Sequence, residues 1–180
     1  MNSIDTVGGR RRRTTPPSTP DDLRAADPLG GRDWGWVNQM RPFVLHFSVP
    51  GAQVFDPFCG FGSTLLAAAL EGRTAHGMEI DTARAQLART RLQRHGVEAP
   101  VVVGMLADTA PAAAIDLCLT NVLSFGCHWR GEALPGQLYA SADYAGYLSG
   151  MRAVLHGCES GDGRTASAWQ WWKTSLSVGA

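Results

Sequence analysis

Four short, mainly apolar runs recur along the middle of the chain, and a polar residue or a glycine ends or follows each of them. The runs cover residues 52–56, 74–78, 100–103 and 115–120. Short, nearly continuous apolar runs are typical of strands that are buried on both faces of a parallel sheet. The segments between the runs have the spacing of helices. The pattern therefore predicts an α/β fold.

The turn after the first expected strand is rich in glycine. Gly60 and Gly62 can adopt backbone conformations closed to other residues, and they let a ligand approach the main chain closely. Residues 63–64 can cap the helix that follows, which we expect over residues 65–71. With Glu79 at the end of the second strand, this is the layout of a nucleoside-binding βαβ unit, in which a carboxylate binds ribose hydroxyls.

Two further helices are expected. The first covers residues 82–95, and its apolar positions follow helical spacing: Ala85, Ala88 and Leu92. Its other face carries arginines that we expect to contact solvent: Arg84, Arg89, Arg91 and Arg94. The second covers residues 139–156 and has an apolar stripe that we expect in the core: Tyr144, Tyr147, Leu148, Met151 and Leu155.

Composition divides the chain into three parts. Residues 1–32 are poor in apolar side chains, contain four of the ten prolines and include the run Arg10 to Arg13, so we expect a disordered basic arm. This arm either makes weak nucleic-acid contacts through the four arginines or is simply solvated. Residues 33–160 form the expected domain. Residues 161–180 read as a flexible link and a tryptophan-rich tail.

Charge, apolar run length and cysteine spacing argue against several classes of protein. Sixteen basic and sixteen acidic residues cancel, so the whole chain is not a polyanion binder. No apolar run reaches the ~18 residues of a membrane span, and no signal peptide is evident, so we expect a cytoplasmic protein without a membrane partner. The cysteines lack metal-ligand spacing, which favours reduced thiols over a metal site or a disulfide framework: Cys59, Cys118, Cys127 and Cys158.

Residues 56–64 read D-P-F-C-G-F-G-S-T, which resembles the D-P-F-x-G-x-G-[ST]-T signature of the S-adenosylmethionine-dependent amino methyltransferases. This family methylates exocyclic nitrogens of adenine or cytosine in DNA and, in relatives, of guanine in RNA. The resemblance covers residues 38–120 and implies a Rossmann-like class I methyltransferase sheet. It also implies that S-adenosylmethionine is the cofactor and that these residues bind it: Asp56, Pro57, Phe58, Gly60, Gly62, Ser63, Thr64, Glu79, Ile80, Asp108, Asn38 and Met40.

Two of these assignments depend on the family's architecture. In the family a helix beside the methionine end of the cofactor occupies the position of residues 38–41, which makes Asn38 and Met40 candidates. An acidic residue after the third strand holds the adenine amino group in the family. Here either Asp108 takes that role, or backbone and apolar contacts alone hold the adenine.

The catalytic loop departs from the family's pattern. The family carries [DNS]-P-P-[YFW] after the fourth strand, whereas residues 121–124 read N-V-L-S. Asn121 matches the polar position, and Phe125 comes one residue after the aromatic position. The resemblance therefore implies an acceptor site made of Asn121, the carbonyl of Val122 and Phe125. Because the two prolines that would fix this loop are absent, its shape is expected to differ from the family's.

Several functions remain open. The resemblance implies methyl transfer to an amino nitrogen of a nucleic-acid base, but a small-molecule or peptide amine would need no separate target-recognition region. A different class is a catalytically idle cofactor-binding subunit that acts through a partner. The expected sheet is short or incomplete at its C-terminal edge, and three tryptophans follow it: Trp169, Trp171 and Trp172. We therefore predict a homodimer or a complex with a second subunit.

Overall fold

The computed structural model describes residues 6–7, 10–11, 20–27, 37–106, 114–121, 125–126 and 133–159. The expectations for Arg12 and Arg13, for Asp108 and Val122, for Cys127 and for the tail 161–180 fall outside these residues.

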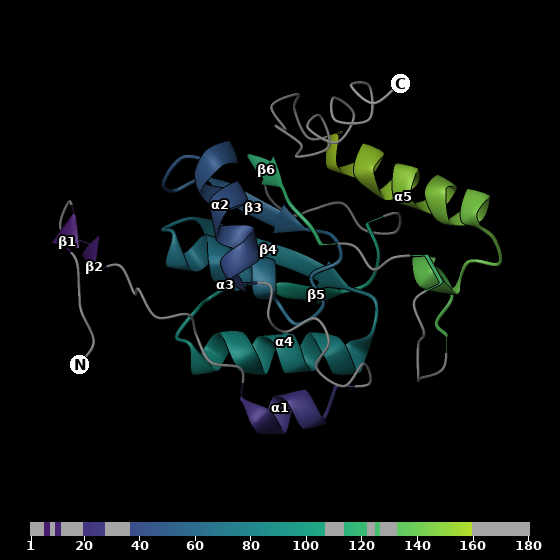
Figure 1. The fold of residues 1–180 in the computed structure, drawn as a ribbon, viewed down its shortest axis with the longest axis horizontal. Coiled ribbons are helices and arrows are strands. Elements are labelled where there is room, and N and C mark those ends of the chain that lie inside the picture. Colours follow the sequence, from purple (N-terminus) through teal and green to yellow (C-terminus); the bar gives the residue numbers. More distant parts are fainter. Residues whose placement is uncertain are drawn as a thin grey trace.

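A four-stranded parallel sheet lies at the centre of the fold, with the strand order β5-β4-β3-β6 (Figure 1). Its strands are β3 (Gln53–Asp56), β4 (Thr74–Glu79), β5 (Val101–Val103) and β6 (Leu117–Cys118). All four strands were expected from the apolar runs, although β6 is shorter than residues 115–120. Main-chain hydrogen bonds from Asp116 to Gln53 and from Leu119 to Phe55 nevertheless extend its pairing with β3 at both ends.

Helices cover both faces of this sheet. Val54 of β3 and Leu117 of β6 pack with α2 (Val37–Phe47), α3 (Ser63–Leu70) and α4 (Thr82–Arg94). The next residues along these strands, Phe55 and Cys118, belong to a second core with α5 (Tyr144–Glu159). Successive strand residues point to opposite faces, so a doubly covered sheet needs continuous apolar runs. The α/β architecture expected from those runs is confirmed.

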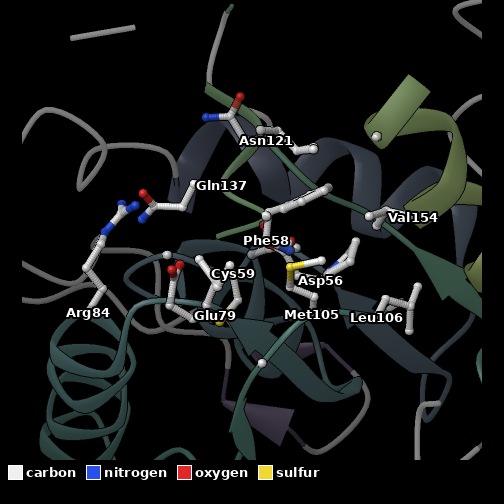
Figure 2. Close-up of a pocket in the computed structure, with 18 of the residues that line it drawn as sticks. Asp56, Phe58, Cys59, Glu79, Arg84, Met105, Leu106, Asn121, Gln137 and Val154 are labelled. Carbon is white, nitrogen blue, oxygen red and sulfur yellow. Dashed lines mark hydrogen bonds between the residues drawn. The ribbon is translucent and has the colours of Figure 1, made fainter. Parts of the chain in front are cut away.

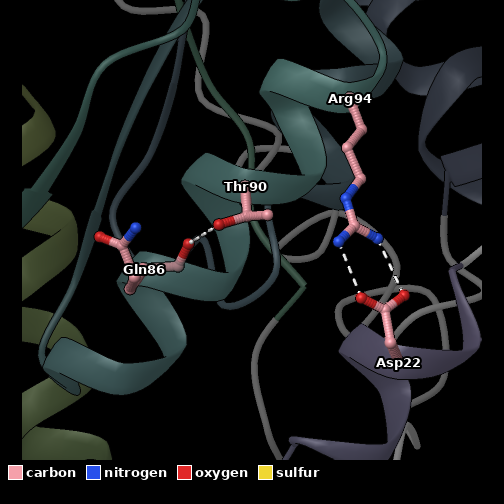
Figure 3. A network of polar contacts seen from close by, with 4 residues as sticks. All are labelled: Asp22, Gln86, Thr90 and Arg94. Carbon is pink, nitrogen blue, oxygen red and sulfur yellow. Dashed lines mark hydrogen bonds and ion pairs between the residues drawn. The ribbon is translucent and has the colours of Figure 1, made fainter.

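Three short elements precede the sheet. They are β1 (Thr6–Val7), β2 (Arg10–Arg11) and α1 (Asp21–Ala25), of which β1 and β2 pair antiparallel. Leu23 of α1 is buried against Phe61, and Asp22 accepts two hydrogen bonds from Arg94 of α4, of 2.7 and 2.8 Å (Figure 3). Because both partners of this ion pair are exposed, its contribution to stability is small.

The expectation that all four arginines of α4 contact solvent is wrong for two of them. Arg84 and Arg91 are buried, whereas Arg94 is exposed and pairs with Asp22. Arg91 donates hydrogen bonds to the carbonyl of Phe61 and to the hydroxyl of Ser63. These two arginines are buried because the glycine turn after β3 packs on that side of α4. The apolar positions Ala85, Ala88 and Leu92 are buried as expected.

The core stripe expected over residues 139–156 is largely wrong. Tyr144 and Leu148 are 54% and 42% exposed, whereas Val154 and Cys158 are the buried apolar residues of α5. A Cβ added at Gly157 would lie 2.9 Å from Leu106, so α5 approaches the fold through its small residues instead of its aromatic stripe. Within the described residues no strand follows β6.

A short 3₁₀ helix, η2 (Leu138–Ala140), precedes α5. None of the helices in the described part of the chain has the length and apolar character needed to cross a membrane.

Candidate functional site

A cavity of about 250 Å³ opens beside the carboxyl ends of the parallel strands (Figure 2). The strand order reverses next to β3, because the chain runs from β3 through β4 to β5 on one side and returns to β6 on the other. Open α/β sheets bind ligands at this kind of position. The walls of the cavity come from the turn after β3, the ends of β4 and β5, Asn121 after β6, residues 136–138 and α5.

The turn after β3 is packed directly against β4. The Asp56 carboxylate accepts a 3.0 Å hydrogen bond from the Phe58 N–H, and the Cys59 N–H donates a 2.8 Å bond to the Met78 carbonyl. A Cβ at Gly77 would lie 2.7 Å from the Cβ of Cys59, so only glycine allows this approach. Gly77 thus lets the D-P-F-C segment reach the wall of the cavity.

Gly60 and Gly62 both have a positive φ, of 51° and 72°. Gly60 lines the cavity, and a Cβ there would lie 3.2 Å from the Arg84 guanidinium. Gly62 is not among the lining residues, since a Cβ on it would point at Leu92 of α4, 3.3 Å away. The structure therefore gives Gly62 a packing role between the turn and α4, which is not the ligand contact that the sequence suggested.

The expectation that Ser63 and Thr64 cap α3 is also wrong. The helix begins at Ser63 with Gly62 as its N-cap, and no side chain caps it. Ser63 instead accepts a 2.9 Å hydrogen bond from Arg91, and both Ser63 and Thr64 line the cavity. Ser63 and Thr64 therefore contribute to the turn and to the cavity wall, and Gly62 occupies the N-cap position.

Two carboxyl groups are buried at the ends of neighbouring strands. Burial raises the pKa of the Asp56 carboxyl to about 6, while the hydroxyls of Thr120 and Thr64 and the Phe58 N–H act in the opposite direction. Burial also raises the pKa of the Glu79 carboxyl, which the positive charge of Arg84 partly offsets. Glu79 accepts a 2.9 Å hydrogen bond from the Asp81 N–H. Both side chains line the cavity.

Arg84 and Gln137 line the cavity but were not singled out from the sequence. The Arg84 guanidinium lies over the Phe61 ring, 4.6 Å from its centroid, in an arrangement that favours a cation. Its place in the first turn of α4, just after the acid that ends β4, could have pointed to it. Gln137 comes from a loop far along the chain, and no local pattern predicts it.

The cavity brings together most of the residues expected to bind the cofactor, and Asn121 with them. Those that line it are Asp56, Pro57, Phe58, Gly60, Ser63, Thr64, Glu79, Ile80 and Asn121. Asn38 and Met40 lie elsewhere: Met40 is buried in the core that α2 forms with α3, and Asn38 is exposed. They are displaced from the expected position because α2 packs on α3 instead of facing the carboxyl ends of the strands.

Phe125 lies outside the cavity lining, in a small group of aromatic rings. Its ring centroid is 5.6 Å from that of Tyr144 and 5.8 Å from that of Tyr147, both on α5. Phe125 is 39% exposed. Spacings of this size are typical of favourable ring pairs. Part of the expected core stripe of α5 thus forms a partly exposed aromatic surface with Phe125, the residue that follows the N-V-L-S loop.

The cysteines of the described residues are buried thiols. Cys59, Cys118 and Cys158 are free, and the Sγ atoms of Cys118 and Cys158 lie 2.8 Å apart. Among the side chains that the structure describes, no group of three or more His, Cys, Asp or Glu residues could hold a metal ion.

Residues 37–90, from α2 to most of α4, match the DNA methylase family. Over this segment the chain is similar to that family. The match confirms the family expected from residues 56–64, and it contains the whole turn, α3 and Glu79. No curated protein matches the chain at a significant level.

The DNA methylase segment sits in a fold that recurs among solved structures. TehB from Haemophilus influenzae aligns with a TM-score of 0.50 and 10% identity, covering 71% of this chain and 36% of TehB. An S-adenosylmethionine-dependent methyltransferase from Clostridium acetobutylicum aligns with a TM-score of 0.46 and 10% identity, covering 68% of this chain and 44% of that one. The chain thus spans less than two thirds of either structure. The likeness to TehB, together with the parallel sheet, confirms the Rossmann-like fold expected from the sequence.

Proposed function

We propose that this chain is an S-adenosylmethionine-dependent methyltransferase that transfers a methyl group to an amino nitrogen of a nucleic-acid base. The observation that carries the proposal is the cavity at the reversal of strand order, which the DNA methylase segment and Asn121 line together. One cavity therefore joins the candidate donor site to the candidate acceptor side chain.

Several features of the cavity fit the cofactor. The positive φ of Gly60 leaves the main chain open at the turn, and the buried Glu79 carboxylate offers acceptors for ribose hydroxyls. Apolar side chains that suit the adenine ring line the same cavity: Ile80, Met105 and Leu106. Gln137 adds a buried amide nitrogen with no hydrogen-bond partner in the described part of the chain. The residues present therefore match the polar and apolar parts of S-adenosylmethionine.

The chemistry asks little of the side chains beyond positioning. S-adenosylmethionine supplies a methyl group that its sulfonium already activates. Holding two reactants in line can account for most of the rate effect of such a transfer. Asn121 carries an amide oxygen that can accept a hydrogen bond from an incoming amine and so orient it. We assign Asn121 this orienting role, and the Val122 carbonyl is its expected companion.

A nucleic-acid base is the acceptor that the chain favours. The family match is to DNA methylases, and the exposed rings of Phe125 and Tyr144, with the half-buried ring of Tyr147 beside them, offer a surface on which a base can stack. A small-molecule or peptide amine, and an idle subunit that binds cofactor without turnover, are the alternatives that the experiment must separate.

The test measures transfer of a labelled methyl group from S-adenosylmethionine to DNA, RNA and small amines. The proposal expects turnover on nucleic acid, and it expects Asn121→Ala to lower kcat far more than cofactor affinity. Asn38→Ala is the matched control, because Asn38 is an exposed asparagine outside the cavity. Turnover on small amines alone would contradict the base as acceptor. Cofactor binding without turnover on any acceptor would indicate the idle subunit.

A further inference from the structure

Gln137 is a buried glutamine whose side-chain orientation is fixed by its own loop. It is 5% exposed, and its Oε1 accepts a 2.8 Å hydrogen bond from the Leu134 N–H. The Gln137 N–H in turn donates to the Leu134 carbonyl, 3.1 Å away. Because the atom that faces the Leu134 N–H must be an acceptor, the amide cannot be flipped, and the other terminal atom is the nitrogen donor.

That nitrogen, Nε2, is buried and has no hydrogen-bond partner among the described residues. Buried polar side-chain atoms in folded proteins are nearly always paired, so an unpaired donor in a cavity wall indicates a ligand. Gln137 lines the cavity described above. Figure 2 shows its amide turned toward the Arg84 guanidinium, at the end of the cavity where Glu79 also lies.

The charges at this end of the cavity restrict what the amide can bind. Arg84 would disfavour an ammonium group there, and the Glu79 carboxylate would disfavour a carboxylate or a phosphate. A hydroxyl both donates and accepts, so it can donate to Glu79 while its oxygen accepts from an amide N–H. Two neighbouring hydroxyls would satisfy both side chains at once.

We infer that Gln137 donates a hydrogen bond from Nε2 to a ribose hydroxyl oxygen of the bound nucleoside, and that Glu79 accepts a hydrogen bond from the same diol. Gln137 thereby becomes a specificity-determining residue, because it distinguishes a ribose from a deoxyribose. The inference rests on the proposed function, which identifies the nucleoside as that of S-adenosylmethionine.

Calorimetry with S-adenosylhomocysteine and its 2′-deoxy and 3′-deoxy analogues tests this contact. Gln137→Glu keeps the acceptor that faces Leu134 and removes the donor. We expect Gln137→Glu to lower the affinity for S-adenosylhomocysteine roughly 10-fold, as the loss of one buried hydrogen bond would. For the analogue that lacks the contacted hydroxyl, we expect the wild-type protein to bind weakly already and the variant to add little further loss.

Two additional variants make the result decisive. Gln39→Glu, at an exposed position on α2 outside the cavity, introduces the same charge and should leave every affinity unchanged. Gln137→Met keeps the length of the side chain and replaces Gln137→Glu if that variant does not fold. Equal losses for all three ligands would mean a structural role for Gln137 and would overturn the inference.

The failure of the inference and the failure of the proposed function give different results. If the folded wild-type protein binds none of the three ligands, the proposed cofactor is wrong. If the wild-type protein binds S-adenosylhomocysteine and the Gln137 variants bind it equally well, the cofactor assignment stands and the diol contact is wrong.

Discussion

Asp56 shows how burial changes the chemistry of one residue. Its carboxyl lies at the end of β3 with a pKa raised to about 6 by burial, although it accepts a hydrogen bond from the Phe58 N–H. A raised pKa means that the folded state holds the proton more tightly than the unfolded chain does. Ionisation of this buried carboxyl therefore lowers the stability of the folded protein. Such a buried acid is more typical of a binding site than of a core that only stabilises the fold.

The stability of the protein should consequently fall as the pH rises from about 4 to about 6, because the unfolded Asp56 ionises near pH 3.8 while the folded one remains protonated. The full effect of this shift is about 3 kcal/mol. Asp56→Asn should flatten this part of the profile in urea unfolding at a series of pH values. Asp22→Asn is the control, because Arg94 lowers the pKa of the exposed Asp22, and its profile between pH 4 and 6 should match the wild type. If the dependence of stability on pH is the same in Asp56→Asn as in the wild type, burial of Asp56 does not cause this fall in stability.

Gly62 provides a second test at the residue scale. Its φ of 72° is strained for any other residue, and an added Cβ would lie 3.3 Å from Leu92. Gly62→Ala should lower the free energy of unfolding by about 1–2 kcal/mol from the backbone conformation, with a further loss from the contact. Gly51→Ala is the matched control, because Gly51 has a φ of 85° and nothing within 4 Å of an added Cβ. Equal losses in the two variants, measured by urea unfolding, would show that the contact with Leu92 does not matter.

Among the helices and strands, the positions of the main elements could be predicted from consecutive residues, but the elements that pack against them could not. The four strands and the glycine turn follow from consecutive residues, so the sequence was sufficient for the part of the cavity lining that comes from the turn after β3 and the end of β4. The exposure of Tyr144 and Leu148 depends on what lies beside α5, and the burial of Arg84 and Arg91 depends on a turn that precedes α4 in the chain. Helical periodicity identifies an apolar face, but it does not say which part of that face is covered.

Arg91 connects α4 to the glycine turn, and its loss should loosen both. It is fully buried, and burial lowers the pKa of its guanidinium to about 10, so it stays charged at neutral pH. Arg91→Met removes its donors to Phe61 and Ser63 and should lower the free energy of unfolding by about 1–3 kcal/mol.

Arg94→Met is the matched control on the same helix, since the exposed ion pair of Arg94 with Asp22 should contribute less than about 1 kcal/mol. Chemical denaturation of both variants measures the difference. If Arg91→Met is no more destabilising than Arg94→Met, Arg91 does not hold the turn.

At the scale of the whole molecule, the sequence predicted the family and the sheet, whereas Gln137 could be recognised only after folding. Residues 56–64 and Glu79 carry the family's pattern within one βαβ unit. Gln137 reaches the same cavity from a loop between β6 and α5, and its orphaned amide nitrogen is visible only in three dimensions. Comparison of the N-V-L-S loop with the family's motif identified Asn121, but it did not identify the aromatic group around Phe125.

Assembly also belongs to this scale and remains a prediction. The exposed stripe of α5 includes Tyr144 and Leu148, and no strand follows β6 within the described residues. Contiguous exposed apolar surface often marks a contact with another chain, so we expect a homodimer or a complex with a second subunit. Light scattering should give a dimer mass at micromolar concentration, and deletion of residues 165–180 should reduce it. A monomer mass that the deletion does not change would contradict this prediction.

We expect the cavity between the DNA methylase segment and α5 to bind the S-adenosyl cofactor, and calorimetry with S-adenosylhomocysteine measures this binding without any acceptor. We expect one bound ligand per chain, an affinity at least about 10-fold weaker in Glu79→Ala, and an almost unchanged affinity in Asn121→Ala. Glu79 is buried at the end of β4, whereas Asn121 is assigned to the acceptor. The absence of binding by the folded wild-type protein, or full affinity in folded Glu79→Ala, would show that this cavity does not bind the cofactor in the proposed way.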